Sequence, residues 1–209
     1  MNIKKTSLYN LHQQHNAKFV EFAGYEMPIQ YKEGIVEERK FTSNHCGIFD
    51  VSHMGQLYIY GDDQLLEDLE KIFPIDLKNL KVNHSKYSFL MNADAGIHDD
   101  LIVTKIEGGV IIILNAACKN TDFEILQKTL GGKYKMILDD EKSLIAIQGP
   151  QSSKILEELI PGVNDLSFMS GNWFEFQGSK TFITRSGYTG EDGFEISLEN
   201  SKIEQLTNN

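Results

Sequence analysis

The segment from Gln56 to Leu138 alternates strand-like and helix-like hydrophobic patterns in an order that few small folds share. Its periodicity and its turn residues predict strand, helix, three strands, helix and strand. This order is close to a ferredoxin-like βαββαβ unit with one extra strand. The predicted strands are Gln56–Tyr60, Lys86–Met91, Ile97–Ile106, Val110–Leu114 and Tyr134–Leu138. One predicted helix begins after Asp62, which would cap it, and the other begins near Asn120.

The flanking segments also mix helices with strands. Helical spacing over Glu33–His45 predicts one helix, and a second follows Gly149, with Pro150 placed in its first turn. Further strands are predicted over Ser143–Gln148, Phe174–Phe176, Lys180–Arg185 and Gly193–Leu198. The whole pattern predicts an α+β chain with mostly antiparallel sheets.

Composition narrows the range of partners. The chain has 209 residues, enough for one large or two small domains, and a formal net charge of −10. An acidic surface argues against nucleic acid or an anionic membrane as the main partner. The sequence also lacks the run of about 18 apolar residues that a membrane-spanning helix needs.

The cysteines and the amino terminus indicate in which cellular compartment the protein is found. Cys46 and Cys118 are far apart and neither belongs to a CxxC pair, so we expect no disulfide framework and no structural zinc. The first eight residues have neither the apolar core of a signal peptide nor the arginine content of a transit peptide. We therefore expect a soluble, cytoplasmic protein.

The stretch from Arg185 to Glu195 reads RSGYTGEDGFE and has a glycine at every third position. Glycine suits backbone that must take φ > 0 or approach another group closely. Tyr188 can stack, and the carboxylate of Glu195 can accept two hydrogen bonds from a planar donor edge. The stretch is typical either of a binding loop for a flat, N–H-rich heterocycle or of a glycine-rich hairpin with polar decoration.

Three other strings accompany this motif in order: FAGYEMP from Phe22, NHCGIFDVSHMG from Asn44 and IHDDLIV from Ile97. Together, from about Leu8 to Glu195, they resemble the aminomethyltransferase (T-protein) family of the glycine cleavage system. The resemblance implies transfer of the one-carbon unit from the aminomethylated lipoyl arm of the H-protein to tetrahydrofolate. Ammonia and 5,10-methylenetetrahydrofolate would be the products.

The resemblance also implies a domain organisation. Residues 1–55 and 137–209 would form one discontinuous folate-binding domain, and residues 56–136 would be the inserted ferredoxin-like domain. The family continues into a carboxy-terminal β-barrel that has no counterpart in this sequence. Because that barrel helps to close the family's active site, the activity of this chain alone is an open question.

Asp100 is the candidate catalytic carboxylate. Successive strand residues point to opposite faces, so Asp99 and Asp100 cannot both face one pocket. Two adjacent acids before an apolar run are costly if they are buried without partners, although a solvated strand end would explain them equally well. The resemblance places Asp100 near the folate nitrogens, where a carboxylate can stabilise a developing cation or move a proton.

The resemblance assigns four further residues to folate binding. Glu195 would accept the pterin N–H donors, and Tyr188, Tyr87 and Met54 would line the pocket. Without the resemblance, each has an ordinary explanation, such as an exposed strand acid or a gap-filling methionine. We expect no metal, because His53 has no second ligand at a regular spacing and strand alternation separates the possible ligands His98, Asp99 and Asp100.

Two other functions remain open. A folate-dependent demethylase of a small N- or S-methyl compound would use a related fold. A non-catalytic folate-binding module would do so as well, but such relatives typically carry a cysteine where this chain has Ser186-Gly187 before Tyr188. The complete glycine-rich string therefore favours the aminomethyltransferase.

Overall fold

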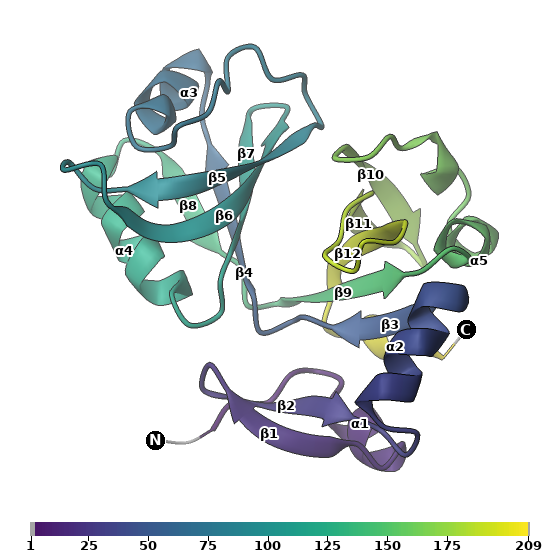
Figure 1. Cartoon of the computed structure of the whole chain (residues 1–209). Coiled ribbons are helices and arrows are strands. Elements are labelled where there is room, and N and C mark those ends of the chain that lie inside the picture. The colour runs from purple at the N-terminus through teal and green to yellow at the C-terminus, as the bar shows by residue number, and fades with distance from the viewer. Residues whose placement is uncertain (1–2, 209) are drawn as a thin grey trace. The chain divides into compact units, whose positions relative to one another are not determined.

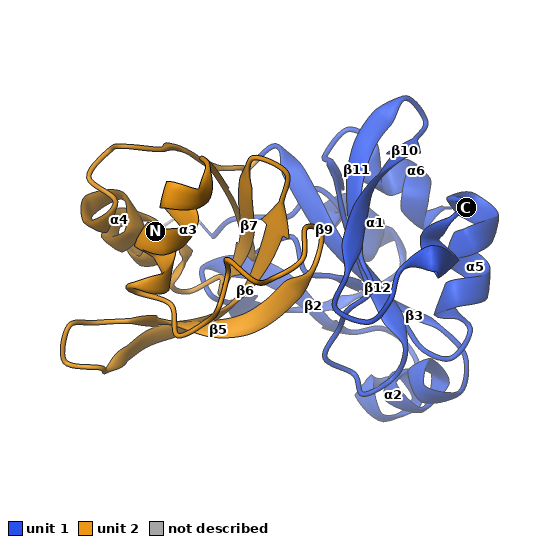
Figure 2. Ribbon diagram, turned by 90° about the horizontal axis from the view of Figure 1, so that it is seen from above, with its two compact units in different colours: residues 1–53, 141–209 blue, residues 54–140 orange. Residues whose placement is uncertain are grey.

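The computed structural model describes residues 3–208 and forms two compact units. Unit 1 combines residues 1–53 with 141–209, and unit 2 spans residues 54–140 (Figure 2). The expected boundary between residues 136 and 137 would divide the strand Lys135–Leu138, which pairs with Gly55–Tyr60 of unit 2 along its whole length. Backbone pairing thus keeps this last strand in unit 2.

Unit 2 is a five-stranded antiparallel sheet in the order β5-β6-β7-β4-β8, with two helices (Figure 1). Removing β5 leaves the strand order of a ferredoxin-like unit, so the predicted α+β architecture is confirmed. Its elements are β4 (Gly55–Tyr60), α3 (Asp63–Glu70), β5 (Ser85–Met91), β6 (Ile97–Ile106), β7 (Gly109–Leu114), α4 (Lys119–Thr129) and β8 (Lys135–Leu138).

One face of this sheet is buried under the helices. Leu101 and Val103 of β6 belong to the same core cluster as Leu69 of α3 and Leu126 of α4. The predicted cap at Asp62 is confirmed, since its carboxylate accepts a hydrogen bond from the backbone N–H of Gln64 at 3.1 Å. Strand alternation then assigns the residues between the core positions to the opposite face.

Unit 1 contains a second five-stranded antiparallel sheet, in the order β10-β11-β12-β9-β3, and a separate β1-β2 hairpin. Its strands are β1 (Lys18–Phe22), β2 (Tyr25–Gln30), β3 (Gly47–Asp50), β9 (Lys142–Gln148), β10 (Gly171–Phe176), β11 (Ser179–Thr184) and β12 (Gly193–Glu199). Its helices are α1 (Tyr9–Gln14), α2 (Ile35–Asn44), α5 (Ser152–Leu159), the 3-10 turn η1 (Val163–Asp165) and α6 (Ile203–Thr207).

The sequence did not predict β1 and β2. Their turn is Ala23-Gly24, with positive φ at both residues, where asparagine or aspartate before glycine is the usual signal. Pro28 lies inside β2, and proline argues against a strand except at an edge. The usual turn residue was therefore absent, and the proline argued against the strand that the structure contains.

The position of Pro150 differs from the prediction. The helix α5 begins at Ser152 after Gln151, so Pro150 precedes the first turn. Gly149 fixes this entry: its φ is +126°, and a Cβ atom there would lie 2.5 Å from the carbonyl oxygen of His45. The close approach of two backbone segments therefore decides where α5 starts.

Candidate functional site

The predicted site residues belong to both units. Asp100, Tyr87 and Met54 lie in unit 2, whereas Glu195 and Tyr188 lie in unit 1. Each unit holds its own residues in a defined geometry.

The structure brings Asp100 and Tyr87 to one face of the unit 2 sheet. Phe89 pairs with Asp100 and Tyr87 pairs with Ile102, so the four side chains share the face opposite the helices. Tyr87 is 49% exposed, and Phe89 and Asp100 are exposed as well. Two accessible aromatic rings beside a carboxylate can hold a flat, cationic or N–H-bearing group.

Asp99 faces the other way, as strand alternation predicts. It pairs with the buried Leu90 and continues the row of core residues Leu101 and Val103. A register shift follows, because Met91 pairs with Ile97 and His98 is skipped. His98 therefore lies outside the regular pairing of β5 with β6.

Asn115, which sequence reasoning did not single out, contacts both aspartates. Its Nδ2 atom lies 3.0 Å from Oδ1 of Asp99, 3.2 Å from Oδ1 of Asp100 and 3.1 Å from the backbone oxygen of Asp100. The available signal was a polar residue directly after the apolar strand Val110–Leu114. Its significance depended on the pairing of β6 with β7, which one sequence does not give.

Met54 and His53 precede β4. Met54 is half-buried at the start of unit 2. His53 lies at the end of unit 1 and packs edge-on against Phe22 and Tyr25, with ring centroids 5.6 Å and 6.3 Å away. This packing gives His53 a structural role within unit 1.

Glu195 lies on β12 between Thr184 of β11 and Ala146 of β9. Its neighbours Phe194 and Ile196 point into the core of unit 1, so the carboxylate lies on the opposite face. The hydroxyl of Ser186 donates to its Oε2 atom, and no other donor reaches it from residues 3–208. Burial raises the pKa of Glu195 despite this bond.

Two glycines of the predicted binding loop leave room for the side chain of Gln148. A Cβ atom on Gly187 would lie 2.0 Å from Oε1 of Gln148, and one on Gly193 would lie 2.3 Å from its Nε2. Gly190 instead has φ +80° and open space around it, as a turn requires. The loop is thus folded over the buried amide of Gln148.

Gln148 also holds this loop by hydrogen bonds. Its Nε2 donates to the carbonyl oxygen of Ser186 at 2.9 Å, and its Oε1 accepts from Thr189 at 2.8 Å. Nearby, Arg185 binds Asp192 through two hydrogen bonds of 2.9 Å and 2.6 Å. These contacts fix the loop on both sides of Tyr188, which is 69% exposed at its tip.

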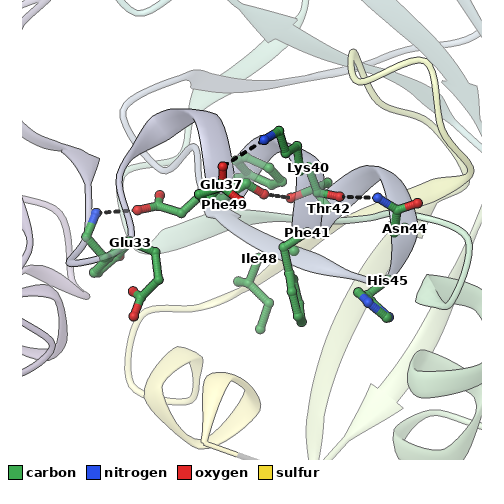
Figure 3. Close-up of a pocket in the computed structure, with 12 residues that line it drawn as sticks. Glu33, Glu37, Lys40, Phe41, Thr42, Asn44, His45, Ile48 and Phe49 are labelled. Atoms are coloured by element: carbon green, nitrogen blue, oxygen red, sulfur yellow. Dashed lines mark hydrogen bonds and ion pairs between the residues drawn. The ribbon is translucent and has the colours of Figure 1, made fainter.

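A separate cavity of about 710 Å³ lies along α2 and β3 of unit 1. Figure 3 shows Phe41 and Ile48 pointing in the same direction, with His45 beside Phe41 at a ring distance of 4.7 Å. None of the predicted site residues lines it. Most of its wall area is apolar, and because the residues that the resemblance assigns to folate lie elsewhere, we do not assign the folate to it.

Residues 3–208 contain neither a cluster of metal-ligand side chains nor a membrane-spanning helix. No group of three or more His, Cys, Asp or Glu side chains in this range is arranged to hold a metal ion. No helix in the described part of the chain combines the length and the apolar character needed to cross a membrane.

Comparison with known proteins defines the family. The GCVT N-terminal domain matches residues 8–209. The chain belongs to this family. A probable mitochondrial aminomethyltransferase of Schizosaccharomyces pombe is 42% identical over 94% of the chain and 52% of its own length. The aminomethyltransferase of Chlorobium limicola is 37% identical over 98% of the chain and 58% of its own length.

One solved structure agrees with this family assignment, and a second shares the fold alone. The glycine cleavage system aminomethyltransferase T of Bartonella henselae superposes with a TM-score of 0.91 and 42% identity, over 99% of the chain and 56% of that protein. A heterotetrameric sarcosine oxidase of Corynebacterium sp. U-96, at 14% identity and TM-score 0.60, shares the fold. The chain thus spans about half the length of the curated GCVT relatives it matches.

Proposed function

We propose that this chain is the folate-binding part of an aminomethyltransferase of glycine cleavage. It would pass a one-carbon unit from the aminomethyl-lipoyl arm of the H-protein to tetrahydrofolate and release ammonia. The relatives that match nearly the whole chain carry the name aminomethyltransferase, and this supports the reaction class.

The carboxylate of Glu195 is the single observation that best supports folate as the acceptor. It is held on a rigid strand, and within the described residues Ser186 is its one hydrogen-bond donor. A mostly buried carboxylate with unused acceptor positions suits the two-donor edge of a pterin, which would compensate the desolvation of the charge. Tyr188 would then cover the ring from the exposed loop.

Asp100 would act on the reacting carbon. That carbon becomes electrophilic as ammonia leaves, and a nearby carboxylate stabilises the developing positive charge and orients the attacking folate nitrogen. Asn115 donates to Asp100 and so limits its motion. Tyr87 would pack against the folate on the same face of the sheet, and Met54 would supply an apolar wall.

The partner in this proposal is the lipoylated H-protein, and tetrahydrofolate is a substrate that accepts the carbon. The sequence predicts a cytoplasmic location. Because one of the relatives named above is a mitochondrial protein, this location is also part of the proposal.

Calorimetric titration of the 209-residue chain with tetrahydrofolate under anaerobic conditions tests the proposal. We expect saturable binding that Glu195→Gln weakens at least about tenfold, as loss of a charged hydrogen-bonding pair predicts. Glu175→Gln, an exposed acid on β10 of the same unit, is the matched control and should bind normally. Equal binding by wild type and Glu195→Gln would refute the assignment of the pterin to Glu195.

Transfer is tested separately with aminomethylated H-protein as donor. Asp100→Asn should reduce the formation of methylenetetrahydrofolate about 100-fold or more while folate still binds, because electrostatic stabilisation of this kind acts on the transition state. Equal transfer from small methylated compounds would favour the demethylase function instead.

A further inference from the structure

Asn115 links the two neighbouring aspartates of β6. Its amide nitrogen has two hydrogens and faces three acceptors: Oδ1 of Asp99, and Oδ1 and the backbone oxygen of Asp100. This arrangement leaves the amide little freedom to rotate or to exchange its oxygen and nitrogen. The orientation of Asp100 therefore depends on how firmly Asp99 is held.

The second oxygen of Asp99 is buried, and none of the described residues donates a hydrogen bond to it. Oδ2 of Asp122 is in the same situation. Asp122 is 2% exposed and lies in the first turn of α4, and its carboxyl group lies close enough to that of Asp99 for a hydrogen bond between them. Two carboxyl groups form such a bond when one of them carries a proton.

The surroundings favour the protonated form. Asp99, Asp122 and Asp100 all act on the thiol of Cys118, which precedes α4, so at least three acidic groups gather at this point of unit 2. Burial, the hydrogen bond to Asp99 and the charge of Asp99 raise the pKa of Asp122 to about 7. Burial and the nearby carboxylates likewise raise the pKa of the Cys118 thiol. Lys119 follows Cys118 in the chain, and its Nζ atom lies 3.9 Å from Oδ1 of Asp140.

We propose that Asp122 is a positioning residue that shares one proton with Asp99, and that this pair fixes Asn115 and, through it, the carboxylate of Asp100. The pair lies on the helix-covered face of the sheet, while Asp100 lies on the open face. A proton held on one face would thus orient the reacting carboxylate on the other. The role of Asp100 in transfer rests on the proposed function, but the shared proton does not.

Nuclear magnetic resonance of the isotopically labelled 209-residue chain tests the pair without any ligand. The side-chain amide of Asn115 and the carboxyl carbons of Asp99, Asp100 and Asp122 are followed from about pH 4 to pH 9, a range that spans the ordinary aspartate pKa and the raised one. Asp122→Asn keeps a donor toward Asp99 but cannot titrate. Asp76→Asn is the matched control, because Asp76 is an exposed acid of unit 2 that also accepts from an asparagine.

We expect the Asn115 amide and the Asp122 carboxyl to titrate together with a midpoint near 7 in the wild type and in Asp76→Asn. Asp122→Asn should abolish this midpoint and leave one sharp Asn115 amide signal. Asp122→Ala, which removes the donor, should shift or broaden that signal at every pH. If Asp122→Ala does not fold, the titration of Asp122→Asn alone tests whether the proton is shared.

The inference would be overturned if the Asp122 carboxyl titrated at about pH 4. It would also be overturned if the pH dependence of the Asn115 amide signal were the same in Asp122→Asn as in the wild type. A chain that shows the shared titration but fails to bind tetrahydrofolate would contradict the proposed function and leave the proton pair established. Where folate binds, Asp122→Asn should preserve transfer that Asp122→Ala reduces about tenfold. Loss with both variants would contradict the positioning role.

Discussion

A Cβ atom on Gly187 would lie 2.0 Å from Oε1 of Gln148, so the loop that carries Tyr188 closes over a buried amide with no room for a side chain. Gln148 in turn binds Ser186 and Thr189, one on each side of that loop. The side-chain amide of Gln148 therefore holds the loop in place on both sides of the exposed Tyr188.

Replacing Gly187 by alanine should destabilise unit 1 by about 2 kcal/mol or more, because φ is +156° and the new methyl group would overlap Gln148. Gly190→Ala, which meets no atom within 4 Å, should cost about 1 kcal/mol from backbone strain alone. Urea unfolding measures both. In a Gln148→Ala background the cost of Gly187→Ala should fall, and an unchanged cost would contradict the steric explanation.

Folate affinity should depend on the ionisation of Glu195. Burial raises the pKa of this carboxyl in the free chain, and pterin N–H donors would favour its charged form. Binding should therefore weaken as the pH falls through the raised pKa of Glu195 and level off above it. Glu195→Gln should bind weakly with no such pH dependence, and calorimetry at several pH values compares the two proteins. Parallel pH profiles would mean that another group titrates.

Tyr188 should matter for binding and not for folding. Its ring is 69% exposed, so Tyr188→Ala should change the free energy of unfolding by less than about 0.5 kcal/mol. Loss of stacking should weaken tetrahydrofolate binding by about 1 kcal/mol, or roughly fivefold. Phe168, also 69% exposed, is the matched control, and Phe168→Ala should leave the affinity unchanged. Equal losses for both would indicate a general effect of exposed aromatic area.

The buried pair of His12 and Asp50 should be important for stability. His12 Nε2 lies 2.9 Å from Oδ2 of Asp50, its Nδ1 lies 2.7 Å from the hydroxyl of Tyr31, and Ser52 N–H donates to Asp50. His12→Ala should cost about 3 kcal/mol, because it leaves a buried carboxylate short of a donor. Lys40→Ala, which breaks the exposed pair with Glu37, should cost less than about 0.5 kcal/mol.

Acid titration provides a second test of this pair. Burial by itself would raise the pKa of Asp50, but hydrogen bonds from His12 and Ser52 outweigh it and hold the pKa below its ordinary value. The stability from Asp50 is therefore present above the ordinary aspartate pKa and is lost as the pH falls through the lower, folded-state pKa. Asp50→Asn should be less stable at neutral pH and should show a flatter acid transition.

Asp122 should have the opposite effect on stability. Its folded-state pKa is raised to about 7, so its stabilising contribution is complete below the ordinary aspartate pKa and is lost as the pH rises through 7. The free energy of unfolding should thus decline between about pH 4 and pH 8 in the wild type. Asp122→Asn should reduce this decline, as measured by chemical denaturation at each pH. An identical decline in the variant would assign it to other groups.

Much of the fold follows from local sequence. The cap at Asp62, the apolar stripe of α3 and the strand runs of β6 and β7 are set by residue type and spacing, and each appears where the pattern predicts it. The hairpin β1-β2 does not, because Ala23-Gly24 forms its turn without the usual residue and Pro28 interrupts the strand signal.

The candidate site divides in the same way. The sequence by itself indicated candidate residues for binding and catalysis, including Asp100, Glu195 and Tyr188, and the strand period already separated Asp99 from Asp100. Only the tertiary structure decided that Asn115 reaches both aspartates, that Asp122 meets Asp99, and that Gly187 is required by Gln148. These contacts join residues of different strands and helices, so they depend on sheet register and helix packing, which local periodicity does not encode.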